Sequence, residues 1–152
     1  MAVLFSPDYF SYEGSMIRRV MEKEKIDTKI WISAGTKQWT SERREMMRMF
    51  SGKGLEYGKD LFLYEGDKEY NNDKAWAGQI AYPVKYFSCG EAGNIKNINI
   101  SVFKQEEENG DLYCQANCMA EFDSGVKYSL GTNAKYSIDN GEISEEGIIY
   151  PP

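Results

Sequence analysis

Histidine is absent from all 152 residues, so this chain offers no imidazole as a general base, proton shuttle or metal ligand. Cysteine is scarce as well, with only Cys89, Cys114 and Cys118. Cys114 and Cys118 fall on one face of a predicted strand, about two strand steps apart, which is too far for a disulfide without a bend. We expect buried thiols in a reducing compartment, and the residues present predict no metal site and no cofactor.

Long hydrophobic runs and basic patches are also missing. No apolar run approaches the roughly 18 residues of a membrane span, and residues 1–7 lack the basic segment of a signal peptide. The formal net charge is -6, and the basic residues are mixed with acids along helical stretches. This pattern argues against nucleic-acid binding, which needs lysine and arginine gathered on one face. We therefore expect no membrane and no nucleic-acid partner, and these features favour the cytoplasm.

Apolar strands and amphipathic helices alternate through the first part of the chain. Runs at 2–5, 29–34 and 60–64 read as buried strands closed by proline or glycine. Helical stretches are predicted at 15–25, from Thr40 or Ser41 to Phe50, and from 72 until Pro83 disturbs the pattern. Three such repeats predict a βαβαβα unit with a three-stranded parallel sheet over residues 1–90.

The pattern changes over residues 91–152, where apolar and polar residues alternate. The alternation is clearest at Ile98, Ile100 and Val102, and it recurs through 112–122, 126–130, 136–138 and 148–150. Turn signals separate the runs, so we predict an antiparallel β meander of four or five strands with one apolar face. About 60 residues form a marginal domain alone, so this face should pack on the first region or on a partner.

Ligand sites in parallel α/β sheets lie at the carboxyl ends of the strands. Those ends lie at 6–9, 35–39 and 65–72. The candidates for a ligand-facing surface are Tyr9, Phe10, Trp39 and Tyr70. Residues 71–73, Asn-Asn-Asp, also have the composition of a helix N-cap with an acid in the first turn.

Three segments resemble one enzyme family. They are 2–10 (AVLFSPDYF), 30–38 (IWISAGTKQ) and 71–76 (NNDKAW). Residues 1–88 resemble the C-terminal portion of the esterase D and enterochelin-esterase-like α/β-hydrolases. The resemblance implies a partial α/β-hydrolase half-sheet, with Asn71 at the family's histidine position and Gln38 at that of the acid. The Gly-x-Ser-x-Gly nucleophile elbow of this fold is absent.

An asparagine cannot take a proton from a serine, and a glutamine has no charge to stabilise an imidazolium. We therefore expect a catalytically incompetent hydrolase remnant with a binding or assembly role, and the resemblance implies a small ester or a glycan as ligand. One alternative is the C-terminal piece of a carboxylic-ester hydrolase whose nucleophile comes from an upstream chain. Another is a carbohydrate- or protein-binding β module, in which Tyr113, Tyr128 and Tyr136 form an aromatic platform.

The first predicted strand would form an open edge of the parallel sheet if the family's preceding strands are missing. Open edges are usually covered, because their unpaired backbone groups template further strands. We expect the cover to be the β region, a second copy of the chain, or an upstream hydrolase segment.

Overall fold

The computed structural model describes residues 1–5, 18–37, 41–106 and 112–150. Its first sheet has the order β1-β2-β3 and is parallel throughout. Its strands are β1 (Ala2–Phe5), β2 (Ile30–Gly35) and β3 (Leu61–Gly66). The predicted three-stranded parallel sheet is confirmed. Of the helix predicted at 15–25, the described residues 18–25 are helical only at 18–21, so the prediction is wrong for its second half.

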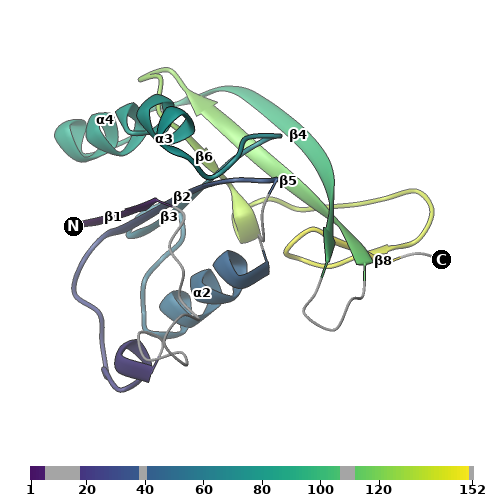
Figure 1. Ribbon diagram of the computed structural model, residues 1–152, viewed down its shortest axis with the longest axis horizontal. Helices are drawn as coiled ribbons and strands as arrows, with labels where there is room; N and C mark the ends of the chain where they lie inside the picture. The colour runs from purple at the N-terminus through teal and green to yellow at the C-terminus, as the bar shows by residue number, and fades with distance from the viewer. Residues whose placement is uncertain (6–17, 38–40, 107–111, 151–152) are drawn as a thin grey trace.

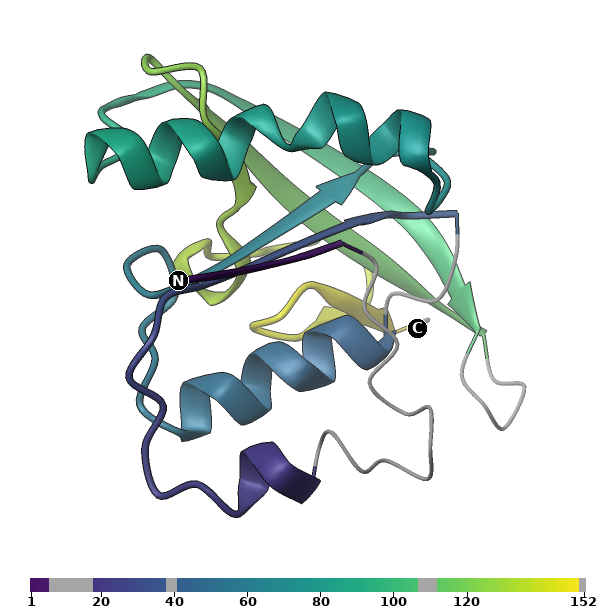
Figure 2. The ribbon, with the colours of Figure 1, turned by 60° about the vertical axis from the view of Figure 1, so that its left-hand side comes forward.

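Helices cover both faces of this sheet, as Figure 2 shows. Helix α2 (Ser41–Gly52) lies on one face, and α3 (Asp73–Gln79) and α4 (Ala81–Cys89) lie on the other. Side chains alternate along a strand, so Ile30 and Ile32 point toward α2 while Trp31 points away from it. Every residue of β2 and β3 is buried, which explains their continuous apolar runs.

The helix after β3 differs from its prediction. It breaks at Ile80, and α4 then carries Pro83 buried in its first turn. Backbone N–H groups of a first turn have no intrahelical acceptor, so a proline there costs no helical hydrogen bond. The same ring would clash with the carbonyl group four residues earlier in a continuous helix, which places the break before Pro83. Pro83 therefore divides the stretch into two helices instead of ending it.

The second sheet is antiparallel and has five strands. They are β4 (Ile95–Glu106), β5 (Leu112–Phe122), β6 (Lys127–Ser129), β7 (Glu142–Ile143) and β8 (Ile148–Tyr150). Figure 1 shows β4 and β5 as its long strands. The order is β4-β5-β8-β7, and β6 also pairs with β5. An antiparallel sheet is confirmed, but the chain does not run through it as a simple meander.

The predicted strand at Tyr136 and Ile138 is wrong. After β6 the chain forms a short 3-10 helix, η1 (Gly131–Asn133), and continues without strand structure to β7. The edge of β5 that faces away from β4 already pairs with β6 at Met119–Glu121 and with β8 at Cys114 and Gln115. No position on that edge is left for another strand.

Two buried clusters hold the molecule together. The α2-side cluster consists of Ile30, Ile32, Met46, Met47, Phe50, Leu55, Leu61 and Leu63. The aromatic cluster consists of Trp31, Phe62, Tyr64, Tyr86, Ala92, Ala120, Phe122, Val126 and Tyr128. The rings of Phe62 and Tyr128 lie 5.2 Å apart in an edge-on arrangement, which joins the two sheets. The apolar face of β5 and β6 thus packs on the first region, as expected.

The second sheet lies at the β3 end of the first, because β6 runs beside β3. Strand β1 pairs only with β2 among the described strands. The expectation that the β region covers the β1 edge is therefore wrong. Cover by a second copy or by an upstream segment stays a prediction.

Candidate functional site

Asn71 lies at the carboxyl end of β2. Its Oδ1 accepts a hydrogen bond of 2.7 Å from the backbone N–H of Gly35, and the N–H of Lys37 donates to the Glu69 carbonyl. The loop lies so close to the strand that a Cβ on Gly35 would sit 2.1 Å from the Glu69 carbonyl oxygen. Only glycine fits there. The predicted position of Asn71 at the sheet edge is confirmed, and its side chain contacts the backbone of β2.

The next residue, Asn72, caps helix α3. Its Oδ1 accepts from the N–H of Ala75 at 3.1 Å, and Asp73 follows in the first turn. An asparagine cap satisfies one otherwise orphaned donor, and the acid faces the positive end of the helix dipole. The N-cap prediction is confirmed, with the capping side chain assigned to Asn72.

The other predicted site residues are only partly described. Gln38, Trp39, Tyr9 and Phe10 lie outside the described residues, so their proximity to Asn71 stays a prediction. Tyr70 is exposed, and the ammonium group of Lys37 lies 4.4 Å from its ring centroid, as in a cation–π contact.

A buried polar chain that the sequence did not reveal lies beneath this loop. Ser33 Oγ donates to Gln79 Oε1 at 2.7 Å, and Gln79 Nε2 donates to Glu69 Oε2 at 2.5 Å. A serine beside a glutamine has no base to take its proton, because a carboxamide does not titrate near neutral pH. Ser33 is therefore held as a hydrogen-bond donor without activation as a nucleophile.

A polar pocket of about 270 Å³ lies between the carboxyl end of β3 and the second sheet. We call it the asparagine pocket. It is lined by Tyr64, Glu65, Asp67, Asn97, Asn99, Ser101, Asn117, Met119, Glu121 and Lys127. This location is the end of a parallel sheet where ligands bind in α/β folds.

Cross-strand pairs form one side of the asparagine pocket. The register of β4 and β5 places Asn97 opposite Glu121, Asn99 opposite Met119, and Ser101 opposite Asn117. Residues opposite each other in an antiparallel pair share a face, so these six side chains form a grid. The polar residues of the alternation at 97–101 were visible in the sequence. The residues of β3 that complete the pocket were not, because their position depends on the tertiary fold.

Hydrogen bonding differs across this grid. Asn117 is buried and held, because its Oδ1 accepts from Ser129 Oγ at 2.7 Å. The side chains of Asn97, Asn99 and Ser101 make no hydrogen bond to any other residue in the described part of the chain. Glu121 pairs with Lys127 at 3.0 Å, and this lysine lowers the pKa of the carboxyl group. The pocket thus presents neutral amides beside an ionised carboxylate.

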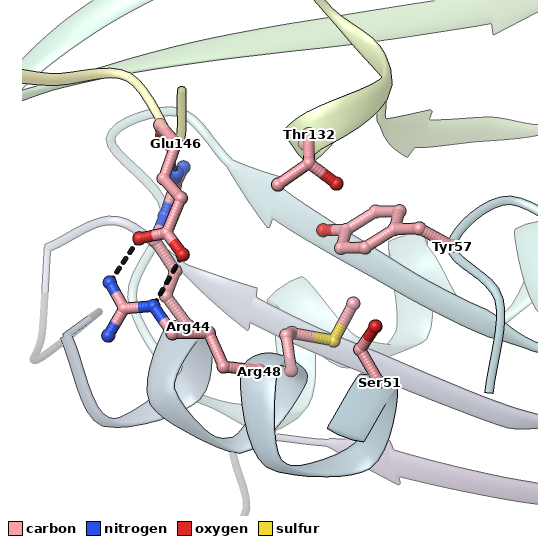
Figure 3. A pocket seen from close by; sticks show the side chains of 8 residues that line it. Arg44, Arg48, Ser51, Tyr57, Thr132 and Glu146 are labelled. Atoms are coloured by element: carbon pink, nitrogen blue, oxygen red, sulfur yellow. Dashed lines mark hydrogen bonds and ion pairs between the residues drawn. The ribbon is translucent and has the colours of Figure 1, made fainter. Parts of the chain in front are cut away.

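A second pocket, of about 260 Å³, lies along α2. We call it the hydroxyl pocket. It is lined by Arg44, Met47, Arg48, Ser51, Tyr57, Gly131, Thr132 and Glu146. Figure 3 shows the hydroxyl groups of Tyr57 and Thr132 pointing toward each other across it. Burial raises the pKa of Tyr57, so its phenol is neutral at physiological pH.

Both arginines of the hydroxyl pocket are neutralised by carboxylates. Arg44 forms a buried ion pair with Glu65 at 2.5 Å, and it donates to the Glu146 backbone carbonyl at 2.9 Å. Arg48 forms a two-point contact with the Glu146 carboxylate, as Figure 3 shows. The guanidinium groups therefore clamp the β7–β8 turn onto α2 and have no charge left for an anionic ligand.

The proposed aromatic platform is not available. Tyr128 is only 7% exposed and lies in the aromatic cluster, while Tyr113 and Tyr136 are half-buried. A stacking platform needs exposed ring faces, so this prediction is wrong for Tyr128. The described residues contain no group of three or more histidine, cysteine, aspartate or glutamate side chains arranged to hold a metal ion.

The described fold is a mixed α/β protein with a parallel and an antiparallel sheet. No family model, no curated protein and no solved structure matches the chain. The esterase-like resemblance therefore stays a prediction that rests on the three segments quoted above. None of the helices in the described ranges is long and apolar enough to cross a membrane.

Proposed function

We propose that this chain is a non-catalytic binding protein that holds a small glycan in the asparagine pocket. The observation that carries the proposal is the set of side chains at Asn97, Asn99 and Ser101, whose hydrogen-bonding groups have no partner within the described chain. Polar groups aimed into a concave site and left unpaired are the groups a ligand satisfies.

The chemistry of the pocket favours a glycan over an ester. Each carboxamide offers donors and an acceptor, and the carboxylates of Asp67 and Glu121 only accept. Sugar hydroxyl groups both donate and accept, so adjacent hydroxyls can satisfy an amide and a carboxylate together. An ester group only accepts, so it could bind the amide donors but could not donate a hydrogen bond to either carboxylate. Met119, between the polar pairs, offers an apolar contact for the C–H groups of a sugar ring.

The residues at the sheet edge support a role without catalysis. Asn71 and Ser33 are occupied by hydrogen bonds to Gly35 and Gln79, and no histidine is present in the sequence. The proposal retains an esterase-like α/β-hydrolase origin, supported by the strand–helix alternation and by Asn71 at the carboxyl end of β2. An upstream chain that supplies a nucleophile would still lack a base at Asn71, which disfavours the split-enzyme alternative.

A glycan array followed by titration calorimetry with the best-bound saccharide tests the proposal. Asn99→Ala should weaken binding by about tenfold or more, because one or two hydrogen bonds worth roughly 1 kcal/mol each are lost. The matched control is Asn140→Ala, which truncates an exposed asparagine outside the pocket and should leave affinity unchanged.

Two results would overturn the proposal. One is an array without any bound saccharide, or binding that Asn99→Ala leaves intact. The other is turnover of p-nitrophenyl acetate that a serine-directed phosphonate abolishes, because this would reveal an active nucleophile.

A further inference from the structure

Strand β4 forms one end of the antiparallel sheet, whose order is β4-β5-β8-β7. It pairs with β5 along eleven positions, and its other edge pairs with no described strand. At 12 residues it is the longest strand described, whereas β1 at the edge of the parallel sheet has four. An edge of this length presents a row of backbone donors and acceptors to a further strand.

An exposed apolar stripe runs along one face of β4. Its members, with their exposed fractions, are Ile95 (49%), Ile98 (49%), Ile100 (66%) and Val102 (58%). On β5 the residues opposite them are Phe122, Ala120, Cys118 and Ala116, all of which are buried. The apolar face is therefore covered over β5 and left open over β4, next to the free edge. The expected packing of this apolar face on the first region is seen for β5 and β6 but not for β4, where packing on a partner stays a prediction.

The usual protections of an edge strand are missing from its centre. Natural edges are blunted by proline, bulges or charged side chains. Residues 97–103 carry neither charge nor proline, and the one irregularity of the pairing lies before them, between Ile95 and Asn97. Charge enters only at Lys96 and Lys104, on either side of this segment.

We propose that a second copy of this chain pairs with β4, antiparallel and centred on Ser101. A two-fold axis perpendicular to the sheet keeps each face of the strand on the same side in both copies. The two apolar stripes then meet, with Ile100 of one copy beside Val102 of the other. Lys104 falls opposite Ile98, so no lysine of β4 faces a lysine of the second copy. The pairing thus brings apolar residues together at its centre and places no two lysines opposite each other.

The expected dimer is weak. One strand pair of this length covers less than the roughly 1,200–2,000 Å² of a standard stable interface, so we expect dissociation in the micromolar range. Sedimentation velocity from about 1 to 500 μM should show a monomer–dimer equilibrium. Ile100→Lys should raise the dissociation constant about tenfold or more, because the ammonium group meets the apolar stripe of the second copy. Ile138→Lys is the matched control, an exposed isoleucine outside both sheets, and should leave the dissociation constant unchanged.

Disulfide trapping tests the pairing independently of the effect of Ile100→Lys on folding. In a Cys89→Ala background, which removes the exposed native thiol, Ser101→Cys should give a disulfide-linked dimer on mild oxidation. Asn97→Cys in the same background should give much less, because the two positions 97 lie away from the axis. A monomer at all concentrations would overturn the proposal, even if another protein's strand then binds β4. A dimer that Ile100→Lys leaves intact, or that position 101 does not trap, would overturn it as well.

Discussion

The two pockets have similar volumes, yet their charged and amide groups are organised differently. In the hydroxyl pocket, Arg44, Arg48 and Glu146 are bound to one another or to Glu65. In the asparagine pocket, Asn97 and Asn99 contact no polar partner among the described residues. Polar groups that form hydrogen bonds or ion pairs with each other stabilise a fold, whereas polar groups without a protein partner at a concave surface can bind a ligand. The ion pairs of the first pocket support a structural role, and the proposed binding role belongs to the second pocket.

The largest expected effect is at the buried ion pair of the hydroxyl pocket. Glu65→Gln leaves the Arg44 guanidinium buried without a countercharge, so we expect a loss of about 3–5 kcal/mol in the free energy of unfolding. Urea denaturation followed by circular dichroism measures it. Glu56→Gln, which removes an exposed pair with Lys59, is the control and should give an unchanged midpoint. Similar midpoints for both variants would refute the structural role of Arg44 and Glu65.

The next largest effect on stability separates two asparagines of the asparagine pocket, one buried and one exposed. Asn117→Ala removes a buried acceptor and leaves Ser129 Oγ without its partner, which should cost about 1–3 kcal/mol. Asn99→Ala removes the same chemical group at an exposed position and should change stability by no more than about 0.5 kcal/mol. Equal losses would show that the two asparagines do not differ in role.

The smallest effect concerns the Arg48–Glu146 contact, which is partly exposed. Glu146→Gln should cost up to about 1 kcal/mol at pH 7. Hydrogen bonding to Arg48 lowers the pKa of Glu146, so its contribution is present above the unfolded-state pKa and is lost as the pH falls through the folded-state pKa. The stability difference between wild type and Glu146→Gln should therefore shrink at about pH 3. A difference that is as large at pH 3 as at pH 7 contradicts this assignment.

Local signals predicted the parallel half well. Continuous apolar runs, closing glycines and the asparagine cap act over a few residues, and β2, β3 and the α3 cap lie where these signals placed them. Tyr136 was misassigned because alternation does not show that β6 and β8 already occupy the edge of β5 that faces away from β4. The partners of Glu65 and Gln79 were not predictable, since they come from helices whose packing depends on the whole fold. The asparagine pocket could not be predicted from the sequence, because its lining depends on the β4–β5 register and on how these two strands lie against β3.

The irregular pairing at the start of β4 decides which residues share its two faces. Ile95 lies opposite Phe122 and Asn97 opposite Glu121, so Lys96 is an extra residue without a partner on β5. This bulge shifts the alternation by one step and brings Ile95 onto the same face as Ile98, despite their odd spacing. Because side chains alternate with a period of two, shifting the rest of β4 by one residue would exchange the isoleucines and the asparagines. A deletion that shifted the register of β4 by one residue would therefore convert the polar pocket wall into an apolar one.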